Sequence, residues 1–131
     1  MRSSCTTSSS GLAERVFWWR LAAHGYGLID DRAPGGRRTR PAYHALQTFL
    51  QMTATSTFRR LLATGDGACY FLFESNEGKG WALAYAHPRS VTAPPPFSFD
   101  HLHDHLGREQ RLDTPHVTLT GRPVYFLNVR F

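Results

Sequence analysis

Three histidines alternate along the stretch His101-Leu-His-Asp-His105. On a β-strand, His101, His103 and His105 would share one face, because successive side chains point to opposite sides of a sheet. Imidazole nitrogens grouped in this way can bind a divalent metal such as zinc. Gly107 follows closely, however, and the residues around it have the composition of a turn, which would separate the three rings. The pattern therefore favours surface histidines over a metal site, and we expect no cofactor.

The remaining residues with reactive side chains lack a catalytic arrangement. His24 lies beside a loop glycine and His44 on a predicted helix, and no Ser-His-Asp or Cys-His spacing accompanies them. The two cysteines, Cys5 and Cys69, are too few for a metal cluster. One lies in a polar leader and the other in an apolar run, so a structural disulfide is not expected.

Composition limits the partners and the location. The 131 residues carry a net charge of +5, but only Lys79 is a lysine, and the arginine clusters are short. Aromatic residues do not interleave with these arginines as a base-stacking surface requires, so we predict a solvated basic surface and no nucleic-acid partner. No run of about 18 apolar residues is present, which predicts no membrane-spanning helix. The leader MRSSCTTSSS lacks the features of a signal peptide, which makes the cytoplasm the default location.

The first third of the chain predicts a strand, a long loop and a helix. Residues 14–21, ERVFWWRL, are aromatic and β-branched and have the length of a strand buried on both faces. Glycine, acidic residues and arginine dominate residues 24–40, which are predicted to be exposed loops. Pro41 then suits the first position of a helix, and apolar residues follow at a spacing of about 3.6 as far as Met52.

From Thr64 onward the periodicity is that of strands. Residues 69–73 form an apolar run and residues 81–87 alternate strictly, which predicts a β-hairpin. Residues 88–96 contain four prolines and are expected to connect strands rather than to pair. Further strands are predicted at residues 96–100, 116–120 and 123–127. The predicted fold class is therefore α+β and mostly β, a small antiparallel β-sandwich with one amphipathic helix and an N-terminal strand.

The successive segments ERVFWWRL, GYGLIDD, RPAYHAL and LTGRPVYFL resemble the C-terminal end of bacterial retaining β/α-barrel glycoside hydrolases of xylosidase-like and cellulase-like families. Those proteins place an aromatic residue on the last barrel strand, a GL-D turn in the next loop and a C-terminal β-sandwich after the final helix. The resemblance covers residues 12–127. It implies a barrel-terminal strand, loop and helix at 12–56 and a sandwich at 57–131, whereas the leader at 1–11 is expected to be disordered because of its polar composition. A complete barrel needs about 200 residues or more, so at most one strand-helix unit is expected here.

The resemblance implies a non-catalytic fragment. Retaining glycosidases use two carboxylates about 5 Å apart, which in this family lie on earlier barrel strands. None of the ten acidic residues matches the motifs of those carboxylates, so the chain alone is expected to be inactive. Trp18 and Trp19 would stand at the end of the last barrel strand, where the active site of a barrel lies. One of them can form the floor of a sugar-binding subsite, and core packing is the equal alternative.

Three functions stay open. The favoured hypothesis is a glycosidase fragment whose sandwich braces the barrel and contributes to carbohydrate binding, with an upstream barrel domain as partner or self-association through the N-terminal strand. The second is an independent carbohydrate-binding module, in which Trp81 and Tyr85 present coplanar rings. The third is a small metal- or polyanion-binding protein that uses the histidines and arginines.

Overall fold

The computed structural model describes residues 21–22, 27–32 and 35–130. Within these residues, helix α2 spans Pro41–Thr53 and is accompanied by ten strands. The strands are β1 (Ile29–Asp30), β2 (Arg38–Thr39), β3 (Ser56–Ala63), β4 (Ala68–Ser75), β5 (Gly80–Ala86), β6 (Val91–Ala93), β7 (His101–His103), β8 (Glu109–Gln110), β9 (Val117–Leu119) and β10 (Val124–Val129). The α+β, mostly β class with antiparallel sheets is thereby confirmed. None of the described residues belongs to a helix with the length and apolarity that a bilayer crossing requires.

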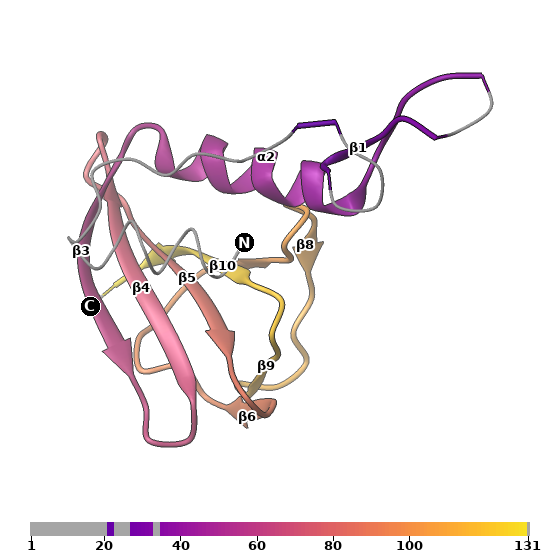
Figure 1. Ribbon diagram of the computed structural model, residues 1–131. Coiled ribbons are helices and arrows are strands. Elements are labelled where there is room, and N and C mark those ends of the chain that lie inside the picture. The colour runs from indigo at the N-terminus through magenta and orange to yellow at the C-terminus, as the bar shows by residue number, and fades with distance from the viewer. Residues whose placement is uncertain (1–20, 23–26, 33–34, 131) are drawn as a thin grey trace.

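The largest sheet has six strands in the order β3-β4-β5-β10-β7-β8 (Figure 1). Strands β3, β4 and β5 form a meander, and β10, from the C-terminal part of the chain, pairs with both β5 and β7. Opposite residues of an antiparallel pair lie on the same face, so the register Phe73↔Trp81 and Phe71↔Leu83 groups large side chains on one side of the sheet. The small alanines of β5 consequently point to the other side.

The alanine side of the large sheet packs against the two-stranded sheet β6-β9. Ala82 and Ala84 are fully buried, and their small side chains let the second layer approach closely. The N–H of Ala86 even donates a hydrogen bond to the carbonyl of Thr120, just after β9, at 2.8 Å. Phe126 of β10 fills the centre of this layer and is 0% exposed. These two layers form the β-sandwich that the sequence predicts.

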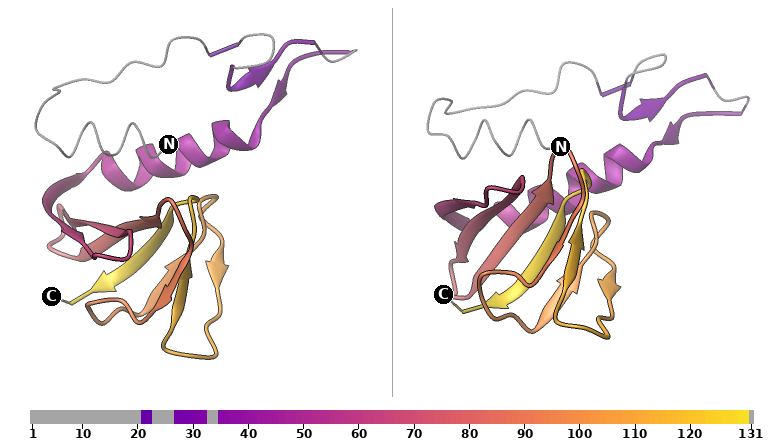
Figure 2. Two further views of the ribbon diagram at one scale, coloured as in Figure 1. Left: turned by 60° about the horizontal axis from the view of Figure 1, so that its bottom comes forward. Right: turned by 90° about the horizontal axis from the view of Figure 1, so that it is seen from below.

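Helix α2 covers the opposite, aromatic side of the large sheet (Figure 2). Pro41 occupies the first turn, where its missing N–H costs no helix hydrogen bond. Ala45 and Phe49 are four residues apart and therefore share one face of the helix, and both are buried. The large sheet is thus enclosed between β6-β9 on one side and α2 on the other.

A short hairpin of β1 and β2 precedes α2 and extends beyond the N-terminal end of that helix (Figure 1). Ile29 pairs with Thr39, and Asp30 pairs with Arg38. Gly35 and Gly36 have φ values of 90° and 139°, which glycine adopts without the steric cost that other residues would have. These residues were predicted to be loops, and this prediction misses two short paired segments, Ile29–Asp30 and Arg38–Thr39, which residues 31–37 connect.

The structure confirms the predicted helix, the hairpin of β4 and β5, and the strands β9 and β10. The predicted strand at 96–100 is wrong: only Ser98 forms a bridge there, and the paired strand β7 follows it. The prediction that residues 88–96 do not pair is also wrong, because Val91–Ala93 lies between the prolines and retains the N–H groups that a ladder needs. Of the predicted strand at 14–21, residues 14–20 lie outside the described residues, and Leu21 is described as a bend.

Candidate functional site

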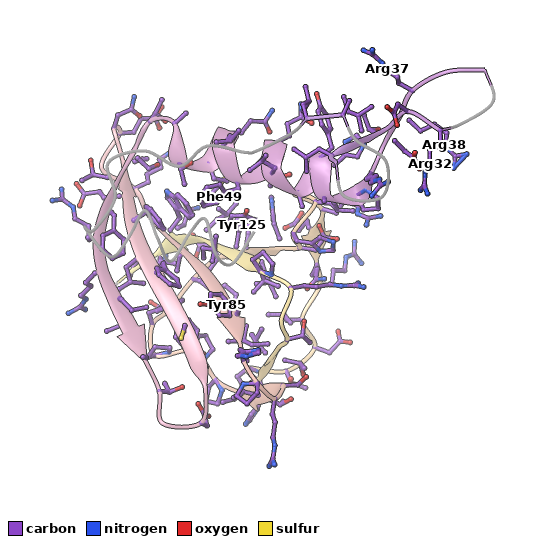
Figure 3. The ribbon with its side chains drawn as sticks, viewed as in Figure 1. Arg32, Arg37, Arg38, Phe49, Tyr85 and Tyr125 are labelled. Atoms are coloured by element: carbon purple, nitrogen blue, oxygen red, sulfur yellow. The ribbon has the colours of Figure 1, made fainter. Side chains whose placement is uncertain are left out.

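The contact between α2 and the large sheet is an aromatic layer, which we define as Phe49, Phe71, Phe73, Trp81 and Tyr125. All five side chains are buried. The rings of Phe73 and Trp81 are stacked, with centroids 4.3 Å apart and an interplanar angle of 7°. The ring centroid of Tyr125 lies 6.1 Å from that of Trp81. Figure 3 shows Phe49 and Tyr125 between the helix and the sheet. The helix is therefore joined to the sandwich by a continuous apolar core.

Ser56 links the end of α2 to this layer by two hydrogen bonds. The indole N–H of Trp81 donates to the Ser56 hydroxyl at 2.9 Å, and that hydroxyl donates to the carbonyl of Met52 at 2.9 Å. Burying an indole N–H without a partner would be costly, so Ser56 satisfies Trp81 and the last turn of α2 together. The position of the helix end on the sheet is thus fixed by polar contacts as well as by packing.

The same geometry decides how Trp81 and Tyr85 can be used. Trp81 is only 4% exposed, and its ring lies flat against Phe73 rather than facing solvent. Tyr85 is half-buried and stacks on Phe71 with ring centroids 5.9 Å apart. A carbohydrate-binding surface of two exposed, coplanar rings is therefore not formed by this pair. Trp81 belongs to the aromatic layer, and Tyr85 packs against it.

Trp18 and Trp19, the predicted sugar-subsite residues, lie outside the described residues, as do His24 and Cys5. Cys69 is described, is half-buried and carries a free thiol, and burial raises the pKa of that thiol. Neither tryptophan can therefore be placed relative to the sheet or the helix.

The three histidines of the possible metal site are separated. His101 and His103 lie on β7, whereas His105 lies in the following turn, which a backbone hydrogen bond from Gly107 to Asp104 closes at 3.0 Å. A nitrogen of His101 lies 2.7 Å from a carboxylate oxygen of Glu109, and this hydrogen bond lowers the pKa of Glu109. Among the residues that the structure describes, no three His, Cys, Asp or Glu side chains are grouped as metal ligands.

The second feature is a basic hairpin, which we define as the described residues of 29–40. Asp30 lies at its centre. Each carboxylate oxygen of Asp30 accepts one hydrogen bond of 3.0 Å from the Arg32 side chain. Arg40 contacts the same carboxylate at 3.5 Å. The hydrogen bonds from Arg32 hold the pKa of Asp30 well below its usual range, and Asp30 raises the pKa of Arg32 in return. Asp30 therefore holds Arg32 and Arg40 beside the paired strands of the hairpin.

Arg37 and Arg38 differ from these two arginines. Both are exposed, and Figure 3 shows them on the part of the hairpin that extends away from the sandwich. Arg38 is the cross-strand neighbour of Asp30, but the carboxylate of Asp30 already binds Arg32 and Arg40. Within the described part of the chain, Arg37 and Arg38 form no ion pair. They are consequently available to an anion from solution.

A groove of about 490 Å³ lies between the start of α2 and two turns of the sandwich. Its lining is mostly apolar and includes Arg108 and Arg122. Arg108 is held by Asp104 at 3.2 Å. Burial opposes ionisation of Asp104, but hydrogen bonds from the backbone N–H groups of Arg108 and Leu106 lower its pKa overall. The lining residues are Pro41, Ala42, Ala45, Leu46, His105, Leu106, Arg108, Gly121, Arg122 and Pro123.

Reasoning from the sequence treated the arginines of residues 32–40 as a solvated surface and did not separate Arg37 and Arg38 from the others. The local signal was Asp30 itself, a carboxylate two residues before Arg32, which it binds. The pairing of Asp30 with Arg38 had no such signal, because residues 31–37 separate the two and two-residue strands show no periodicity. The aromatic layer had a clearer signal in the alternation of Trp81, Leu83 and Tyr85.

Comparison of the chain with protein-family models, with curated proteins and with solved structures finds no match.

Proposed function

We propose that this chain is the non-catalytic C-terminal part of a β/α-barrel glycoside hydrolase, in which the β-sandwich braces the end of the barrel. The observation that carries the proposal is the aromatic layer. It joins α2, the segment that resembles the final helix of such a barrel, to the large sheet of the sandwich in one buried core. A barrel whose last helix is held in this way cannot move independently of the sandwich.

The outer side of the helical segment supports the same proposal. Leu50 of α2 is 54% exposed, whereas its neighbour Phe49 is 8% exposed. A helix that carries apolar residues on two faces is suited to a position between two layers. Here the inner layer is the sandwich, and the proposed outer layer is the remainder of a barrel.

The acidic groups of the described residues support a role without chemistry. A glycosidase acid needs a raised pKa in order to be protonated near neutral pH. The carboxyl groups whose pKa departs from its ordinary range all depart downward, because of hydrogen bonds and positive neighbours. They are Asp30, Asp66, Asp100, Asp104 and Glu109.

The proposal is tested on the coding region that precedes Met1. We expect an open reading frame that runs through Met1 and encodes barrel strands with two glutamates about 5 Å apart when folded. The longer protein should hydrolyse aryl glycosides, and removing residues 57–131 from it should lower the temperature at which activity is lost. A stop codon directly before Met1, or unchanged thermal inactivation after the removal, would overturn the bracing role.

A further inference from the structure

The basic hairpin lies at a position that corresponds to an active-site loop of a β/α barrel. In a β/α barrel, the loop between a strand and the following helix opens onto the face that carries the active site. The basic hairpin directly precedes α2. If α2 is the final helix of a barrel, as the proposed function holds, this hairpin belongs to the last of these loops. Its side chains would then face a substrate that is bound at the mouth of the barrel.

The charges of the hairpin are divided between structure and surface. Asp30 binds Arg32 through both oxygens and also contacts Arg40, and these contacts fix the base of the hairpin. Arg37 and Arg38 are exposed and have no ion pair among the described residues. Both lie on the part of the hairpin that extends away from the sandwich, and Arg38 is directly opposite Asp30 in the paired strands (Figure 3).

We propose that Arg37 and Arg38 bind the carboxylate groups of an acidic polysaccharide, so that the substrate class of the parent enzyme is a uronic-acid-containing glycan. A guanidinium group binds a carboxylate through two parallel hydrogen bonds, a geometry that a neutral sugar hydroxyl does not match. This inference rests on the proposed function for the location of the site. It adds the chemical class of the ligand.

The described residues favour a glycan over a nucleic acid. Strong binding of single-stranded nucleic acid combines positive charge with aromatic rings on which bases stack. The described residues of the hairpin include no aromatic side chain, and Asp30 and Asp31 lie close to the arginines. The described residues of the hairpin therefore offer positive charge without the ring surfaces on which bases stack.

The test is affinity electrophoresis of the full chain through gels that contain polygalacturonate. Highly methyl-esterified pectin is the matched neutral polymer, and oligothymidylate is the polyanion of another class. The variant R37Q/R38Q removes the proposed contacts. The variant R59Q/R60Q is the control, because it removes the same charge from two adjacent exposed arginines of β3.

We expect polygalacturonate to retard the chain and esterified pectin to leave its mobility unchanged. R37Q/R38Q should weaken the binding by at least about tenfold, which corresponds to about 1.4 kcal/mol. R59Q/R60Q should weaken it by less than about threefold, since net charge alone acts through screened, long-range attraction. Equal losses in the two variants, absence of retardation, or equally tight binding of oligothymidylate would each overturn the proposal.

Failure of this inference can be told apart from failure of the proposed function. A longer reading frame with a barrel, together with a chain that polygalacturonate does not retard, would overturn the acidic substrate and leave the bracing role intact. Specific retardation through Arg37 and Arg38 without an upstream barrel would overturn the position of the hairpin at an active site.

Discussion

The substitution Phe49→Ala tests whether α2 and the sandwich share one core. Phe49 is 8% exposed and is the α2 residue that belongs to the aromatic layer, against which Leu46 and Met52 of the same helix also pack. Truncating a buried phenylalanine costs about 3–5 kcal/mol, because apolar contacts are lost and a cavity remains. Alanine recovers about 0.5 kcal/mol through its higher helix propensity. The free energy of unfolding should therefore fall by about 2.5–4.5 kcal/mol.

The measurement is urea unfolding, followed by tryptophan fluorescence and by far-UV circular dichroism. Because Trp81 lies in the same layer, its fluorescence reports the loss of this core. In thermal unfolding, about 3 kcal/mol corresponds to a decrease in Tm of about 10 °C for a domain of this size. The two signals should change together, as expected when the helix and the sheet unfold in one transition.

Leu50→Ala is the matched control, because Leu50 is the next residue of the same helix and is 54% exposed. Its substitution should change the free energy of unfolding by less than about 1 kcal/mol. If Phe49→Ala and Leu50→Ala have equal effects, or if Phe49→Ala leaves the fluorescence transition in place, the helix does not share the core of the sandwich. The bracing role would then lose its structural basis.

Three further predictions concern the activity, the solubility and the pH-dependent stability of the chain. The purified chain should not hydrolyse aryl glycosides; turnover that disappears when one of its acidic residues is mutated would contradict this. Deleting residues 1–40 should leave the hairpin of residues 69–87 folded and increase solubility, as judged by circular dichroism and sedimentation, and an unfolded sheet would show that the N-terminal segment belongs to the core. The lowered pKa of Asp30 implies a contribution to stability that is present above the ordinary aspartate pKa and is lost as the pH falls through the lowered value. Asp30→Asn should accordingly reduce the pH dependence of the urea midpoint below about pH 4, and an unchanged dependence would show that the Asp30 ion pairs do not stabilise the fold.

The elements that the sequence predicted correctly carry their information locally. Pro41 and the apolar residues behind it mark a helix without reference to the rest of the chain. Strand β5 alternates large and small apolar residues, and its turn toward β4 contains a glycine, so the hairpin follows from neighbouring residues. The fold class could be predicted because these two signals lie next to each other in the chain.

The elements that were missed depend on distant partners. Strand β6 has three residues among prolines, and only its pairing with β9 makes it a strand. Strand β3 contains a bulge between Phe58 and Arg60, which breaks the alternation that reveals a strand from sequence. Whether Arg37 and Arg38 are free to bind an anion likewise depends on which arginines Asp30 binds. The amino-acid composition does not predict which arginines these are.

The exposure of Leu50 favours a third layer outside α2. Phe49 is buried on the sheet, but Leu50, the next residue of the helix, remains more than half exposed. If the proposed barrel covers Leu50 in the longer protein, Leu50→Ala should cost about 2–5 kcal/mol there, as for other buried leucines, against less than about 1 kcal/mol in the present chain. Thermal unfolding of both proteins with and without this substitution measures the difference. An equally small effect in both would mean that Leu50 faces solvent in the parent, and α2 would then contact the sandwich alone.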